Sequence, residues 1–267
     1  WTVGLRPNRL PWLSCVDGSG ILYPRSIHSS HAERPGNVDI TGDPSFDMDR
    51  LRDLLTAERP QFLVFGLLSL VVTGFTGVLT VTSPQVFQPY FGGINPMLSM
   101  LGVLVLGFSL WFLLRSRGWF VVYEPGALRQ NFPLVVVLPT LLAVGMVVVD
   151  VIAVFPPDTN VRFPRSLLFY PTMGYVVEVL FHLLPLSVVF VTADALSRDI
   201  GRPTLLWAVI VVISLLEPVF QLQAGFSSDV PRWVEVYIGL NVYAINLAQL
   251  YLFKRYDFLT MYAFRLV

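Results

Sequence analysis

The sequence predicts an all-α protein, a polytopic bundle of transmembrane helices. Hydrophobic residues make up 54% of the 267 residues and charged residues only 13%, and the mean hydropathy is +0.65. Soluble domains carry about 25% charged residues, so the composition indicates a membrane protein. A helix needs about 20 mostly apolar residues to cross the hydrocarbon core of a bilayer. Six stretches meet this length: residues 62–83, 97–115, 134–155, 167–192, 204–222 and 233–253.

A seventh apolar stretch begins near Phe258 and reaches the last residue, Val267, so we expect a truncated seventh span. Residues 62–267 thus form the predicted transmembrane domain, preceded by an amphipathic cytoplasmic lead over residues 48–61. Residues 1–47 are rich in Pro, Gly and Ser and lack helical or strand periodicity. We expect either a disordered tail or upstream sequence translated in frame, with Met48 as the true start. A peptide of the native protein that maps before Met48 would exclude the second interpretation.

The distribution of positive charge predicts the orientation. The 48–61 lead and the even-numbered loops carry ten lysines and arginines, whereas the odd-numbered loops carry three. The positive-inside rule therefore places the Met48 end in the cytoplasm. Formal net charge is zero and no basic stripe is present, which argues against a nucleic-acid partner. Arginine outnumbers lysine 17 to 1, which is typical of a GC-rich genome, and we expect a prokaryotic cell membrane.

Apolar and polar residues alternate in part of the loop over residues 117–130, "RGWFVVYEPGALRQ". This pattern predicts a short cytoplasmic hairpin or an interfacial segment. Cys15 is the only cysteine, which excludes disulfides and thiolate metal sites within one chain.

The fourth span carries the unusual polar residues. Pro171, Tyr175, Glu178, His182 and Pro185 follow a 4-3-4-3 spacing, which places them on one helical stripe. Glu178 is expected near the middle of the membrane, where a charged residue costs about 2.5–3.5 kcal/mol on insertion scales. Such a residue normally faces the interior of the bundle or a hydrated cavity. The sequence therefore predicts a polar site at Glu178 and His182, although the two could also serve only as structural hydrogen-bonding groups.

The fifth span repeats this pattern with Glu217, which shares a face with Ser214 and Gln221 and precedes Pro218. The predicted orientation places Glu217 in the outer half of the membrane, unless the bend at Pro218 brings it inward. Glu217 could instead pair with Asn241 of the sixth span and hold the two helices together.

Three further polar residues lie toward the end of the chain. Asn246 and Gln249 are one turn apart near the cytoplasmic end of the sixth span, and we interpret them as packing groups. Arg265 falls at about the depth of His182. It could be a counter-ion of Glu178, or it could extend to the membrane interface.

The stretch "VEVLFH", residues 177–182, resembles the first motif of the CPBP intramembrane proteases, the CAAX-processing-protease-like family. That motif reads Glu-Glu-x-x-x-Arg. Glu178 matches its second glutamate, while Val177 replaces the first glutamate and His182 replaces the arginine.

The last residues, "LAQLYLFKRYDFLTMYAFRLV", resemble the later part of the family, where an "RTGSL"-like turn leads into a helix that bears a histidine. On this alignment Arg255 begins the turn and Arg265 occupies the histidine position. The second family motif, Phe-x-x-x-His, has no histidine counterpart here, and Glu217-Pro218 lies in that region. The resemblance covers roughly residues 167–267. It implies a glutamate and histidines that activate a water for peptide-bond hydrolysis, with or without a metal.

Three function hypotheses follow. The chain is a divergent CPBP-type protein, either a peptidase or an inactive relative, with Glu178 and His182 as catalytic residues and Glu217 as a further candidate. Alternatively it is a proton-coupled or small-solute transporter or channel, lined by Glu178, His182, Glu217 and Asn241. In the third hypothesis it is a membrane scaffold subunit. The expected partners are the lipid bilayer and, for a peptidase, a membrane-protein or lipidated peptide substrate, and the sequence identifies no cofactor or metal.

Overall fold

The computed structural model describes residues 58–116, 119–153, 160–196, 202–224 and 231–267. All of them belong to one compact unit, Asp49–Val267. The predictions for residues 1–47 and for the start at Met48 lie outside the described residues, as does most of the 48–61 lead.

Six described helical segments are long and apolar enough to cross a membrane, and each overlaps one predicted span. The long helices are α2 (Arg59–Thr82), α4 (Pro96–Ser116), α6 (Phe132–Ala153), α7 (Ser166–Val177) continued by the π-helix η2 (Glu178–Leu183) and α8 (Leu184–Leu196), α9 (Arg202–Ile213) followed by α10 (Leu216–Ala224), and α11 (Arg232–Arg255). The short ones are η1 (Pro84–Phe87), α3 (Gln88–Phe91), α5 (Ala127–Gln130) and α12 (Phe258–Leu266). The part of the chain that the structure describes contains no strand, and the prediction of a polytopic helical bundle is confirmed.

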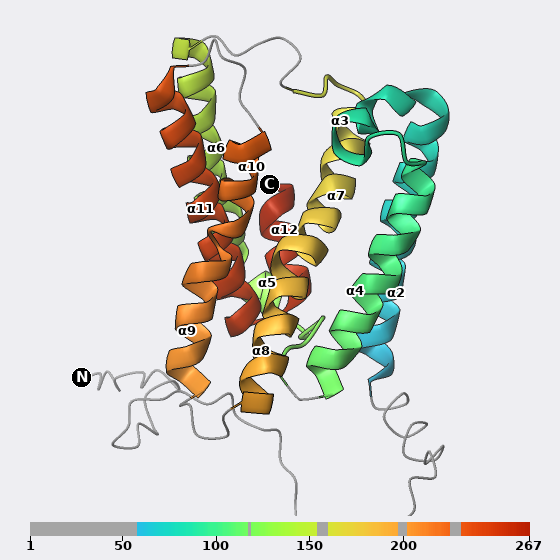
Figure 1. Ribbon diagram of the computed structural model, residues 1–267, viewed down its shortest axis with the longest axis vertical. Helices are drawn as coiled ribbons and strands as arrows, with labels where there is room; N and C mark the ends of the chain where they lie inside the picture. Colours follow the sequence, from blue (N-terminus) through green and yellow to red (C-terminus); the bar gives the residue numbers. More distant parts are fainter. Residues whose placement is uncertain (1–57, 117–118, 154–159, 197–201, 225–230) are drawn as a thin grey trace, which may run out of the picture. The chain divides into compact units, whose positions relative to one another are not determined.

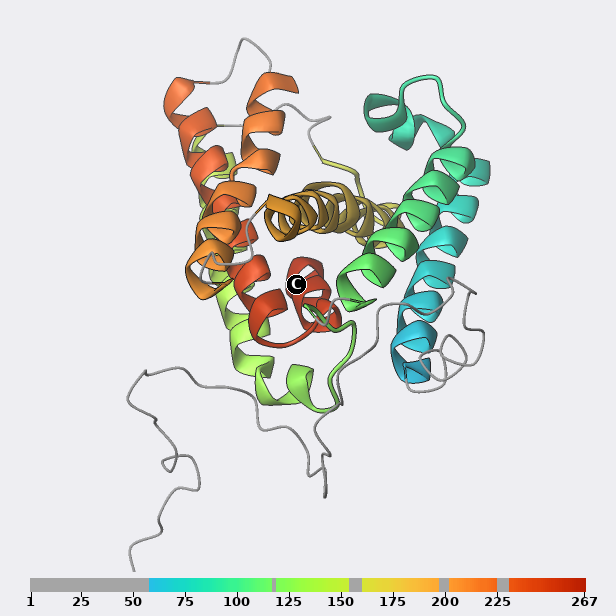
Figure 2. The ribbon, with the colours of Figure 1, turned by 60° about the horizontal axis from the view of Figure 1, so that its bottom comes forward.

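Within this unit, the rod formed by α7, η2 and α8 runs through the centre of the bundle (Figures 1 and 2). It packs against α2 and α4 on one side, while α11 packs against α6, α9 and α10 on the other. The short helix α12 lies between these groups and contacts α6, α7 and α11. The face of the fourth span that carries Glu178 and His182 is therefore covered by protein, whereas Leu180 on the same helix is 36% exposed.

The two faces of α2 show how the bundle meets the bilayer. Phe65 and Val72 are fully buried, whereas Leu63, Leu67 and Leu70 on the opposite face are 61–69% exposed. Extended apolar surface of this kind marks contact with lipid. Together with the lengths of the six helices, it identifies an integral membrane protein that contacts the lipid bilayer.

Two prolines shape the fourth and fifth spans. Pro185 has no N–H, and just before it the helix widens into η2, where the Leu184 N–H bonds to the Val179 carbonyl five residues back. Pro218 likewise cannot donate to the carbonyl of Ser214, and the fifth span is interrupted by a turn there, between α9 and α10. Both irregularities lie next to the glutamates that the sequence singled out.

The segment over residues 117–130, predicted as a short hairpin or an interfacial segment, forms no hairpin in its described part, 119–130. It is irregular up to Gly126 and then forms α5. Its backbone forms hydrogen bonds with groups far away in the sequence. The backbone amides of Val122 and Tyr123 both donate to Oε1 of Gln61, at 2.8 Å each. Phe120 and Val122 are buried in the main apolar core. These partners satisfy the backbone, so no second strand is needed.

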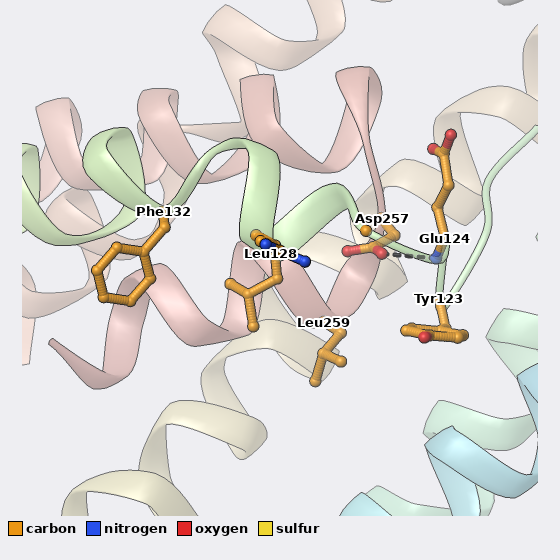
Figure 3. Close-up of a pocket in the computed structure, with 8 residues that line it drawn as sticks. Tyr123, Glu124, Leu128, Phe132, Asp257 and Leu259 are labelled. Carbon is orange, nitrogen blue, oxygen red and sulfur yellow. Dashed lines mark hydrogen bonds between the residues drawn. The ribbon is translucent and has the colours of Figure 1, made fainter.

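The start of α12 is held by Asp257 (Figure 3). One carboxylate oxygen accepts from the Thr260 amide at 2.6 Å as the helix N-cap, and the other accepts from the Glu124 amide at 2.7 Å. Phe258 and Leu259 donate to the carbonyls of residues 121 and 122 at 3.1 and 3.0 Å. This end of α12 is therefore anchored to the 119–126 segment.

Replacing Asp257 with alanine should lower the free energy of unfolding by about 1–2 kcal/mol, because it removes the N-cap. Asp257→Asn keeps the capping oxygen and should lose less. Equilibrium unfolding of both variants in mixed micelles measures the difference. Equal stability of the alanine variant and the wild type would show that the cap does not hold α12.

Candidate functional site

Glu178 and His182 face the interior of the bundle, and both side chains are fully buried. They lie within η2, where the Nδ1 atom of His182 hydrogen-bonds to Oε2 of Glu178. The carboxylate accepts this bond, so the proton lies on Nδ1. π-Helical turns occur frequently at functional sites, and here the turn contains both polar residues.

Arg265 of α12 connects this pair to the fifth span. Its Nε atom donates to Oε1 of Glu178 at 2.7 Å. Its two terminal nitrogens donate to Glu217 of α10, at 3.3 Å to Oε1 and 2.9 Å to Oε2. The planar guanidinium suits such fork-shaped recognition, and one arginine therefore bridges two carboxylates from different spans.

Two amides of α11 complete the site. Gln249 donates to Oε1 of Glu178 and accepts from Arg265 at 2.9 Å. Asn246 accepts from Arg265 at 3.1 Å and donates to the carbonyl of Ser214 at 3.3 Å. That carbonyl has no helical partner because Pro218 follows it four residues later. We name these six residues the Glu178 cluster: Glu178, His182, Glu217, Asn246, Gln249 and Arg265.

Close packing around α7 makes room for the arginine. A Cβ atom on Gly174 would lie 3.1 Å from Cδ of Arg265, so the absence of a side chain lets the arginine pass against the helix. Tyr262, one turn before Arg265, donates to the carbonyl of Pro171 at 2.7 Å. Tyr175 shares a hydrogen bond of 3.0 Å with Ser69 of α2. These bonds fix α12 and α2 against α7 on either side of the site.

Hydrogen-bond satisfaction in the cluster is complete except for one atom. All four carboxylate oxygens accept at least one N–H donor, with Gln221 also donating to Glu217 at 3.0 Å. Among the described residues, the Nε2 atom of His182 is buried and has no hydrogen-bond partner. Buried polar atoms nearly always have a partner, so this nitrogen is the exception within the cluster.

The structure brings together most of the residues that the sequence analysis named. Arg265 pairs with Glu178 as its counter-ion. Asn246 contacts the charged groups directly, and so does Gln249, which we had interpreted as a packing group.

The predicted pairing of Glu217 with Asn241 is wrong. Asn241 donates to the carbonyl of Leu142 on α6 at 3.2 Å and lies outside the cluster, because Arg265 satisfies Glu217 instead. Glu217 and Glu178 lie close together, since both contact one guanidinium.

Sequence reasoning missed Ser69 and Tyr262. Tyr262 precedes Arg265 by three residues, and this spacing on one helical face was an available signal. Nothing in the sequence around Ser69 indicates its contact with Tyr175, since 106 residues separate the two.

The donor set does not fit a metal ion. In the part of the chain that the structure describes, no group of three or more His, Cys, Asp and Glu side chains could hold one. The guanidinium of Arg265 lies between the two carboxylates, where a metal would need to bind.

Comparison of the chain with models of protein families, with curated proteins and with solved structures gives no match.

Proposed function

We propose that this integral membrane protein is a divergent relative of the CPBP intramembrane proteases, with an acid–base site at Glu178 and His182. The two stretches that resemble family motifs contribute Glu178 and Arg265 to one cluster, and the region where the second motif lacks its histidine contributes Glu217. The three residues come from three different helices and form two ion pairs of 2.7 and 2.9 Å. In a relative of the family, the residues at these positions are expected to meet in the membrane. Their meeting in one cluster here supports the proposal.

The geometry supports different roles for Glu178 and His182, the two residues that the sequence-based hypothesis named as catalytic. Both oxygens of Glu178 already accept N–H donors, from His182 on one side and from Gln249 and Arg265 on the other. A carboxylate with these partners orients an imidazole and stabilises its charged form. We assign Glu178 as the positioning residue and the Nε2 atom of His182 as the general base. The unpartnered state of this nitrogen is the observation that carries the assignment.

In the proposed reaction, Nε2 of His182 takes a proton from a water molecule. The resulting hydroxide attacks a peptide carbonyl and forms the new C–O bond. The C–N bond then breaks, and the proton on Nε2 passes to the leaving amine. The expected substrate is a membrane-protein or lipidated peptide, because the site lies among helices that cross the bilayer. We also propose that the Met48 end faces the cytoplasm of a prokaryotic cell.

Replacing His182 with glutamine should reduce hydrolysis of membrane-embedded peptide substrates by about 10²–10⁴-fold, the usual contribution of a general base. Glu178→Gln should also reduce the rate, because the imidazole loses its orienting acceptor. The measurement is cleavage by the purified protein in proteoliposomes, across a panel of transmembrane and lipidated peptides.

Asn241→Leu provides the matched control, since Asn241 is a buried amide of the same bundle outside the cluster. It should retain cleavage. Equal rates for wild type and His182→Gln would reject His182 as the base. If the wild type cleaves no peptide of the panel, the peptidase proposal fails.

A further inference from the structure

A pocket of about 400 Å³ lies at the end of the bundle where two connecting segments meet (Figure 3). One segment connects α4 to α6, and the other connects α11 to α12. The pocket is lined by Tyr123, Glu124, Gly126, Leu128, Arg129, Phe132, Asp257 and Leu259. Its volume falls within the range of small-molecule sites, about 300–1,000 Å³. None of these residues belongs to the Glu178 cluster, so the pocket is separate from the proposed catalytic site.

The pocket lies at the depth where the spans leave the hydrocarbon core. The apolar span of α4 ends at Arg115, and that of α6 begins at Phe132, which itself lines the pocket. α11 ends at Arg255, two residues before Asp257. At this depth a layer of lipid headgroups about 5–7 Å thick borders the core. The pocket is therefore level with the phospholipid headgroups.

The pocket contains unpaired charges of both signs. Glu124 and Arg129 are exposed, and neither side chain has a hydrogen bond or an ion pair among the described residues. In Figure 3, Glu124 and Asp257 lie together at one end of the pocket and Phe132 lies at the other. Both carboxylate oxygens of Asp257 already accept backbone amides. Glu124 is therefore the carboxylate that is free to accept from a ligand, and Arg129 is the free donor.

The rest of the lining is apolar. It comes from Leu128, Leu259 and the rings of Tyr123 and Phe132, and Phe132 is 58% exposed. A small soluble ion would gain nothing from these side chains. The glycerol and the first methylene groups of a lipid would lose contact with water against them, which stabilises by about 25 cal/mol per Å² of apolar area. The lining therefore favours a lipid over a soluble phosphate.

We propose that this pocket binds the headgroup of a phospholipid that carries a primary ammonium group, a phosphatidylethanolamine. The guanidinium of Arg129 donates to the phosphate oxygens, which its fork of N–H groups matches. The ammonium donates to the carboxylate of Glu124 and lies in the negative field of Asp257. The upper part of the acyl chains lies against Phe132. The proposal does not depend on the proposed hydrolysis, because no residue is shared between the two sites.

Native mass spectrometry of the full-length protein released from nanodiscs tests the proposal. The nanodiscs contain equal amounts of phosphatidylethanolamine, phosphatidylcholine and phosphatidylglycerol with identical acyl chains. The protein should retain phosphatidylethanolamine over the other two, because choline has no N–H to donate and phosphatidylglycerol has no ammonium. Preference for phosphatidylglycerol would indicate a site for anionic lipids, and equal retention of all three would indicate non-specific lipid. Either result overturns the proposal.

Two substitutions separate the roles of the charged residues. Glu124→Gln should lower the retention of phosphatidylethanolamine by about two- to fivefold, the effect of one exposed ion pair, and leave phosphatidylcholine unchanged. Arg129→Gln should lower the retention of all three lipids by a similar factor, because all three carry the phosphate. Both side chains are exposed, so both variants should fold. Glu235→Gln, the same change in the first turn of α11 at its opposite end, is the matched control and should change nothing.

Glycerophosphoethanolamine, the same headgroup without acyl chains, distinguishes a lipid from a soluble ligand. It lacks the chains that contact the apolar lining, so it should not displace the bound lipid at equal concentration. Displacement at equal concentration would identify a site for a soluble compound and overturn the proposal. A Glu124→Gln variant that retains lipids as Glu235→Gln does would overturn it as well.

Discussion

Replacing Arg265 with glutamine is expected to lower the free energy of unfolding by about 3–5 kcal/mol, because it leaves two buried carboxylates without a counter-ion. Glu178 loses its 2.7 Å ion pair and Glu217 its 2.9 Å pair in one step. Asn246 and Gln249 also lose the donor to their carbonyl oxygens. Equilibrium unfolding of the reconstituted protein in mixed micelles measures the loss.

Removing one of the two unpaired carboxylates should restore part of the stability that Arg265→Gln loses. Adding Glu217→Gln to Arg265→Gln removes one of the unpaired charges, so the double variant should be more stable than Arg265→Gln alone. Glu178→Gln in the wild-type background should be milder than Arg265→Gln, because Arg265 then still pairs with Glu217. If Arg265→Gln destabilises by less than about 1 kcal/mol, the buried ion pairs do not stabilise this bundle.

Replacing Gly107 with leucine is expected to destabilise the bundle by about 1–3 kcal/mol or more through overpacking. A Cβ atom at Gly107 would lie 3.1 Å from the side chain of Val179 in η2 and 3.4 Å from the hydroxyl of Tyr175. The ring of Phe65 is the third neighbour, with its Cζ atom 3.5 Å from that Cβ position. A leucine there would force α4 away from η2 and disturb the turn that holds Glu178 and His182.

Gly102 of the same helix is the matched control, because a Cβ atom there meets nothing within 4 Å. Gly102→Leu should change the free energy of unfolding by less than about 0.5 kcal/mol. Thermal unfolding of both variants in the same detergent gives the comparison. Similar losses at the two positions would show that α4 does not approach η2 as closely as the structure has it.

Much of the fold could be predicted because a bilayer restricts the choices. A chain that crosses hydrocarbon must form helices of a minimum length, so apolar stretches such as 62–83 and 233–253 translate directly into α2 and α11. The pairing of Glu178 with His182 was equally accessible, since residues four apart on one helix are neighbours. The irregular path of residues 119–126 was not, because its backbone is satisfied by distant groups such as Gln61.

The amino-acid sequence by itself determined that this protein lies in a membrane. It also determined which stretches span the bilayer and which polar side chains lie within those stretches. These properties depend on local composition and helical spacing. The tertiary structure decided how the charges are compensated. It places Arg265 beside Glu178, 87 residues away, and pairs the same arginine with Glu217. It also decided that Gly107, and not Gly102, packs against the site. Such contacts depend on how α12, α10 and α4 pack around α7 and η2, and no local pattern in the chain encodes that packing.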